Sequence, residues 1–185
     1  MATRPEPEAT SITCRPVTVP GWSSRYRASA WPPAQANAQK GGSRPVRLEL
    51  QGLDAELPAA LTVMGVLDVL RVPVTGYVAG QVNGPGLGVL AACGQRRGYP
   101  SAVLGLTEPK LNLDGTATQV RAQEEQVESM VDTLYIRLAG VTRREVDEIR
   151  ADARNGRFFT VPEAVAYGLL DGEARPGDMQ RGGPA

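Results

Sequence analysis

From Val46 onward, segments with the two-residue period of a strand alternate with segments of helical period. VRLEL, at 46–50, alternates apolar and charged residues, as a half-buried strand does. A helix is predicted over 57–70 from apolar residues at helical spacing, which are Leu57, Leu61, Met64, Leu67 and Leu70. PVTGYVAG and PSAVLGL, at 73–80 and 100–106, read as two further strands, with a helix through Cys93 between them. Because parallel strands need a long crossover, this order predicts an α/β domain with a parallel sheet.

The C-terminal third reads as helical. Residues 119–140 form a long amphipathic pattern, whose apolar stripe is Val127, Val131, Leu134 and Leu138. Two Thr-x-x-Glu patterns, Thr142 to Glu145 and Thr160 to Glu163, predict capping boxes that open two shorter helices. Gly168 suits the residue that follows the last helix.

Composition excludes several classes of function. The chain has no histidine, so neither a Ser–His–Asp nor a Cys–His device has the imidazole it needs, and no histidine-ligated metal site is expected. Two cysteines are too few for a thiolate zinc site, and Cys93 is predicted to pack in the core as a small apolar side chain. The net charge of zero gives no basic surface for nucleic acid, and no apolar run is long enough for a membrane span. No cofactor is expected.

Three regions differ in composition. Residues 1–44 are rich in Pro, Ser, Arg, Ala and Gly and are predicted to be a disordered or loosely docked tail, with Trp22, Tyr26 and Trp31 as its unusual aromatic residues. Residues 45–174 make the folded domain, and 175–185 a flexible end. A cytoplasmic location is the default expectation, and a plastid stroma is the alternative if the first thirty residues act as a transit peptide.

The segment between the second strand and the next helix, GQVNGPGLGVLAACG at 80–94, is a glycine-rich turn of the kind that displays a nucleophile. A set of specific residues stands at fixed spacing near the C-terminus: Arg157-Phe158, Glu163-Ala164-Val165, Tyr167-Gly168-Leu169 and Asp171. These residues resemble the end of ClpP, the proteolytic subunit of the Clp protease. The resemblance covers about 46–173, with Gln81 and the LAAC helix in register, and it implies a ClpP/crotonase-like fold of repeated ββα-type units with a long handle helix over 119–139.

The resemblance also assigns the family's functional positions one by one. The nucleophilic serine falls on Gly84, the general-base histidine on Thr107 and the orienting aspartate on Gly156. The oxyanion loop falls on Gly52, Leu53, Asp54 and Ala55, where Asp54 would place a carboxylate against a developing negative charge. The chain is therefore expected to lack peptidase activity and to resemble the serine-less, ClpR-like members of the family.

A crotonase-like alternative uses the same turn differently. VNGPGLG followed by GLTEPKLNL is similar to an enoyl-CoA hydratase core, in which the Gly84 amide would polarise a thioester carbonyl and Glu108 would move a proton. The second glutamate of the hydratases falls on Ala92, which counts against this alternative. A free-standing binding module is a third hypothesis.

The ClpP resemblance further implies partners. A non-catalytic member would act as a structural or regulatory subunit in protein turnover. It would form homo- or hetero-oligomers with ClpP-type subunits through the handle helix, with a Clp ATPase as a possible contact. Neither nucleic acid nor a membrane is expected as a partner.

Overall fold

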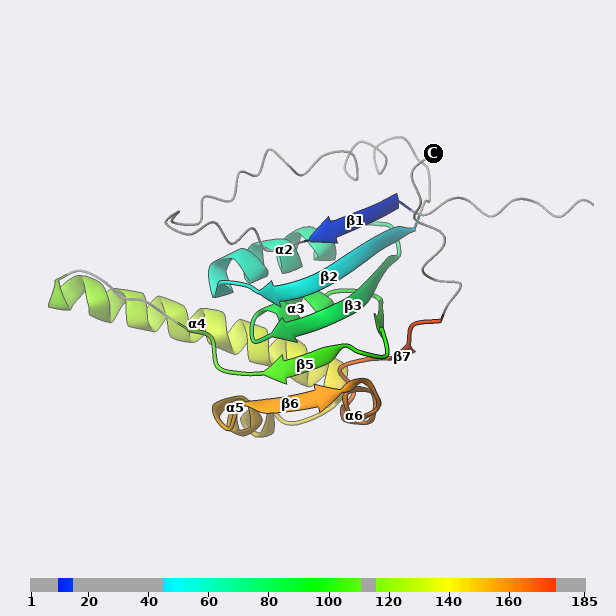
Figure 1. Ribbon diagram of the computed structural model, residues 1–185. Coiled ribbons are helices and arrows are strands. Elements are labelled where there is room, and N and C mark those ends of the chain that lie inside the picture. The colour runs from blue at the N-terminus through cyan, green and yellow to red at the C-terminus, as the bar shows by residue number, and fades with distance from the viewer. Residues whose placement is uncertain (1–9, 15–44, 111–115, 176–185) are drawn as a thin grey trace, which may run out of the picture.

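A computed structural model describes residues 10–14, 45–110 and 116–175, and these form one mixed sheet with helices packed against it (Figure 1). The spatial order is β1-β2-β3-β4-β7, and β5 lies between β3 and β6. The strands are β1 (Thr10–Cys14), β2 (Val46–Asp54), β3 (Val74–Asn83), β4 (Gln95–Gly98), β5 (Val103–Leu106), β6 (Arg157–Thr160) and β7 (Gly172–Glu173). The predicted α/β class is confirmed.

Strand β3 is the centre of the sheet, because it pairs with two different strands on the side away from β2. Its first half, Thr75–Val78, pairs with β4, and its second half, Gln81–Asn83, pairs with β5. All of these pairings are parallel. Because these strands are parallel, the carboxyl ends of β2, β3 and β5 lie at one edge of the sheet. Ligands bind at this edge in many open α/β sheets.

The helices are α2 (Leu57–Val69), α3 (Gly86–Ala91), α4 (Ala117–Thr142), α5 (Val146–Arg154) and α6 (Val161–Tyr167). In α2 the buried residues recur every three or four positions, at Leu57, Ala60, Met64 and Leu67. Helix α3 is buried throughout and contacts both α2 and α4. Figure 1 shows the N-terminal half of α4 extending well beyond the sheet.

The core lies between the sheet and these helices. On β2 the even-numbered Leu48 and Leu50 are buried there, whereas Glu49 and Gln51 point to the other face and are half-exposed. The largest fully buried side chains include Leu48, Leu50, Leu57, Leu87, Leu90, Leu104, Leu106, Leu134, Tyr135, Leu138 and Ile149. Cys93 is buried with them, as the sequence predicts.

The expected tail contains a strand. Thr10–Cys14 pairs in parallel with Val46–Leu50 of β2 and extends the sheet by one strand, within the region predicted to be a disordered or loosely docked tail. The sequence signal is weak because TSITC is short and its pairing partner lies more than thirty residues away. Trp22, Tyr26 and Trp31 lie outside the described residues, and so do residues 176–185 of the expected flexible end at 175–185.

Two local expectations need correction, and two short strands were not predicted. Strand β6 runs antiparallel to β5, so the sheet is not wholly parallel, and β4 and β7 are short strands without a clear periodic signal. Helix α4 continues to Thr142, so Thr142 does not cap the next helix, and Glu145 is the N-cap residue of α5 without a side-chain cap. The Thr160–Glu163 capping box is confirmed, and so is Gly168 at the end of α6.

Candidate functional site: the glycine turn after β3

The glycine turn joins β3 to α3 at the edge where the parallel strands end. Gly84 has φ +47°, a left-handed conformation in which a side chain is strained. Its N–H donates to the Gly105 carbonyl at 2.9 Å, and its own carbonyl accepts from the Leu87 N–H at 3.0 Å. Pro85, the N-cap residue of α3, has no N–H to donate. The turn is therefore held by backbone hydrogen bonds on both sides.

Thr107 lies directly beside this turn. A Cβ atom added to Gly84 would lie 3.2 Å from Thr107 Oγ1 and 3.3 Å from the Thr107 carbonyl oxygen. The parallel pairing of Asn83 with Gly105 positions the two residues, because Gly84 and Thr107 follow shortly after that pair. The positions matched to the family's serine and histidine are thus neighbours. The first is a glycine without a side chain, and the second carries a threonine hydroxyl.

Gly156 reaches the same edge through β6. The antiparallel register pairs Leu106 with Arg157, so Thr107 and Gly156 are the next residues of their strands at the same end of that ladder. Gly156 has φ +65°, and a Cβ atom added to it would meet nothing within 4 Å. No side chain is present there to orient a base at position 107.

The segment matched to the oxyanion loop also borders the turn. The register between β2 and β3 shifts at Gly52, where φ is +56°, and beyond this shift Asp54 pairs with Asn83. Leu53 points inward and would lie 3.2 Å from a Cβ atom on Gly86, whereas Asp54 is exposed. An exposed carboxylate at this place repels a developing oxyanion instead of stabilising it.

Glu108 is engaged with α5 instead of with the turn. Its carboxylate lies 3.4 Å from Arg154 Nε, and both side chains are more than half exposed. Beneath them Tyr135 is fully buried, and its hydroxyl has no hydrogen-bond partner among the described residues. Burial raises the pKa of Tyr135, and the nearby negative charge of Glu108 raises it further. In the crotonase-like alternative, Gly84 and Glu108 would act as a pair. In this structure the Gly84 N–H is hydrogen-bonded to the Gly105 carbonyl, and the Glu108 carboxylate is paired with Arg154.

Two residues at the site have no role in the sequence-based assignment. Asn83 Oδ1 and the Phe158 ring both lie against Gly105, at 2.4 Å and 2.8 Å from where a Cβ atom would be. Gln81 Nε2 donates to Asn83 Oδ1 at 3.0 Å, and the Phe158 side chain is 54% exposed. The sequence gives only a weak signal that Phe158 belongs to this site, because the exposure of its ring depends on the pairing of β5 with β6.

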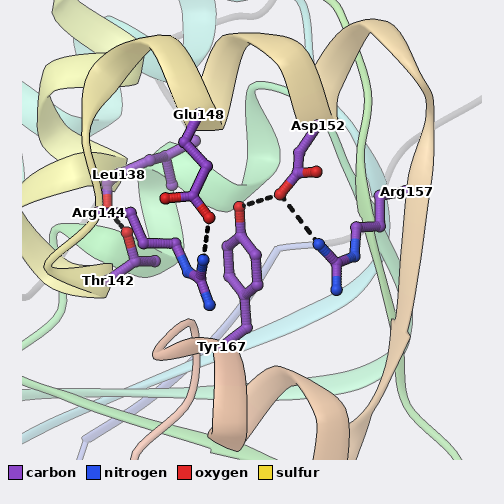
Figure 2. Close-up of polar contacts among 7 residues, drawn as sticks. All are labelled: Leu138, Thr142, Arg144, Glu148, Asp152, Arg157 and Tyr167. Carbon is purple, nitrogen blue, oxygen red and sulfur yellow. Dashed lines mark hydrogen bonds and ion pairs between the residues drawn. The ribbon is translucent and has the colours of Figure 1, made fainter.

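A polar cluster fixes the strand end that carries Gly156 (Figure 2). The Asp152 carboxylate accepts hydrogen bonds from Tyr167 Oη at 2.6 Å and from Arg157 at 3.1 Å, and on the other side of the ring Arg144 pairs with Glu148. Partial burial and the hydrogen bond to Asp152 raise the pKa of Tyr167 well above its ordinary value. The phenol therefore stays protonated and ties α6 to α5.

The described residues contain no group of three or more His, Cys, Asp or Glu side chains placed to hold a metal ion. A hollow of about 740 Å³ lies on the open face of the sheet, with Glu49, Gln51, Tyr99 and Glu173 in its lining, and none of the predicted site residues contributes to it. In addition, no helix of the described chain has the length and hydropathy that a bilayer crossing requires.

Comparison with known proteins identifies the family. The profile of the Clp protease family matches residues 38–174, and the chain therefore belongs to this family. A similar relative is the "ATP-dependent Clp protease proteolytic subunit 1" of Salinibacter ruber, which is 23% identical over 142 residues. That match covers 76% of this chain and 61% of the relative, so the chain spans less than two thirds of that protein's length. The ClpP resemblance and the ClpP/crotonase-like fold expected from the sequence are confirmed.

Proposed function

We propose that this chain is a non-catalytic subunit of a Clp protease assembly, which contributes contacts in protein turnover and does not cleave peptide bonds. The observation that carries the proposal is that Gly84 and Thr107 are neighbours, since a Cβ atom added to Gly84 would lie 3.2 Å from Thr107 Oγ1. A serine peptidase needs a hydroxyl at the first position and a base at the second. A glycine has no nucleophile, and a threonine hydroxyl does not take up a proton near neutral pH.

The surroundings of the turn support the same conclusion. Loss of the triad residues lowers kcat by about six orders of magnitude in a well-studied serine protease, and the remaining rate comes from oxyanion donors and binding. Here the Gly84 amide is bonded to Gly105, Pro85 has no amide proton, and Asp54 adds negative charge nearby. The chain has no histidine elsewhere to replace the base.

The activity test uses the purified full chain and an active ClpP as the positive control. We expect neither hydrolysis of fluorogenic peptides nor covalent labelling by a fluorophosphonate. Gly84→Ser should also be inactive, because Thr107 cannot accept the serine proton. Labelling of a serine near residue 84 in the wild type would contradict the assignment of the turn.

Assembly is tested separately. Co-purification from the native host, with identification of the bound subunits, asks whether ClpP-type partners are present. Val127 is the better position for a disrupting charge, because Val131 packs partly against the core and Val131→Glu would also damage the fold. Val127→Glu should lower the mass in light scattering while the circular dichroism spectrum stays unchanged. A wild type that stays monomeric alone and with ClpP from the same host favours the free-standing module.

A further inference from the structure

The Tyr135 hydroxyl, on α4, is a buried polar group without a hydrogen-bond partner among the described residues. The Tyr135 side chain is fully buried, so solvent does not satisfy its single polar atom either. The described chain contains one other buried atom of this kind, Arg144 Nε, but that side chain is partly exposed and pairs with Glu148 through another nitrogen. Because an unpaired buried hydroxyl loses the hydrogen bonds that water gives it in the unfolded chain, native proteins nearly always satisfy such groups.

Two ion pairs surround this phenol. Asp132 and Tyr135 are three residues apart on α4 and share a face of that helix, and the Arg150 guanidinium lies 5.4 Å from the centre of the Tyr135 ring. Arg150 pairs with Asp132 at 2.5 Å, and Arg154, one turn further along α5, lies 3.4 Å from Glu108. Burial raises the pKa of Tyr135, the charge of Glu108 raises it further, and the charges of Arg150 and Arg154 lower it. Two carboxylates are therefore candidates to accept a hydrogen bond from the phenol.

The two carboxylates are held differently. Asp132 accepts a short hydrogen bond from Arg150, and a carboxylate held in this way is costly to withdraw. The distance between Glu108 and Arg154 exceeds the usual hydrogen-bond range of about 2.7–3.2 Å, and both side chains are more than half exposed. Exposed pairs of this kind contribute little, because water and salt screen them. Glu108 is thus the carboxylate that can change partner at small cost.

We propose that the Glu108 carboxylate exchanges between two partners, Arg154 at the surface and the Tyr135 hydroxyl beneath it. In the second arrangement the phenol O–H donates to a carboxylate oxygen and keeps its proton, so only the rotamer of Glu108 changes. Glu108 directly follows Thr107, which lies beside Gly84. The second arrangement therefore ties the segment after β5 to α4 by one hydrogen bond, and it does so whether or not the chain is catalytic.

The first test is a double-mutant cycle on the full-length chain with Tyr135→Phe and Glu108→Ala. Tyr135→Phe removes only the hydroxyl, and we expect it to lower Tm by about 2–4 °C in the wild type, because a hydrogen bond is lost. In Glu108→Ala the same change should leave Tm unchanged or raise it, because the hydroxyl has no acceptor there. A fall of equal size in both backgrounds would assign the phenol to a bound water or another group and overturn the proposal. No fall in the wild type would overturn it as well.

The exchange itself is tested by removing the competing partner. In Arg154→Ala, Tyr135→Phe should lower Tm by more than it does in the wild type, because Glu108 then has the phenol as its remaining partner. Arg137→Ala is the matched control, since Arg137 is a partly exposed arginine of α4 that pairs with Asp68. There the effect of Tyr135→Phe should equal that in the wild type. Equal effects in all three backgrounds would refute the exchange.

A direct measurement uses isotope-labelled tyrosine and nuclear magnetic resonance. The chain has five tyrosines, and the signal that is missing in Tyr135→Phe belongs to Tyr135. The chemical shift of its Cζ carbon, which carries the hydroxyl, should move in Glu108→Ala, move in the opposite direction in Arg154→Ala, and stay in place in Arg137→Ala. A Cζ shift that does not respond to Glu108→Ala would overturn the proposal even if the stabilities change. None of these results bears on peptidase activity, so the exchange and the proposed non-catalytic role can fail independently.

Discussion

Replacing Gly84 by alanine tests whether the turn is built for the absence of a side chain. At φ +47° an L-residue costs about 1–2 kcal/mol, whereas the reduced entropy of the unfolded chain returns about 0.4–1 kcal/mol. The new Cβ atom also meets Thr107 Oγ1 at 3.2 Å, which requires a small shift of that side chain. We therefore expect Gly84→Ala to lower the free energy of unfolding by about 1 kcal/mol.

For a chain of this size, such a loss corresponds to a fall in Tm of about 2–4 °C, which calorimetry or circular dichroism resolves. Gly140→Ala is the matched control, because Gly140 lies in α4 with nothing within 4 Å of an added Cβ atom. That change should raise stability by about 0.5–1 kcal/mol. Gly84→Asn should cost less than Gly84→Ala in backbone strain, since asparagine tolerates the left-handed region. If Gly84→Ala is as stable as the wild type, the strain argument is refuted.

Three further predictions concern packing, pH and ligand binding. Gly88→Ala should lower the unfolding free energy by about 1–3 kcal/mol, because its Cβ atom would lie 2.5 Å from a side chain of α4, and an unchanged denaturation midpoint would show that the helices have room. Burial alone would raise the pKa of Asp171, but its hydrogen bonds from Arg96 outweigh burial and hold the pKa below its ordinary value of about 3.9. Because the folded pKa is the lower one, this stabilisation is present above the ordinary value and is lost as pH falls through the folded pKa. Acid titration of stability should therefore be shallower in Asp171→Asn, and parallel curves would contradict this account. Calorimetry should detect no acyl-CoA binding by the wild type, whereas a micromolar saturable signal that Glu108→Gln removes would support the crotonase-like alternative.

Much of the local structure follows from the sequence, because its signals are short in range. The alternation in VRLEL and the spacing of Leu57, Met64 and Leu67 depend only on the two periods of 2 and 3.6 residues, and β2 and α2 appear where those periods predict them. The capping box from Thr160 to Glu163 is also local, since both of its hydrogen bonds join residues three apart. The positions matched to the catalytic triad came from resemblance to a family and not from any period.

Tertiary structure decided what depends on pairing between distant segments. The strand at Thr10–Cys14 exists through its parallel partner β2, and the antiparallel direction of β6 comes from its pairing with β5. The placement of Thr107 beside Gly84 likewise needs the β3–β5 register, which a period within one strand does not specify. The sequence alone determined that no serine, histidine or aspartate stands at positions 84, 107 and 156. The fold determined that these three positions lie close together, because they follow or precede strands that end at the same edge of the sheet.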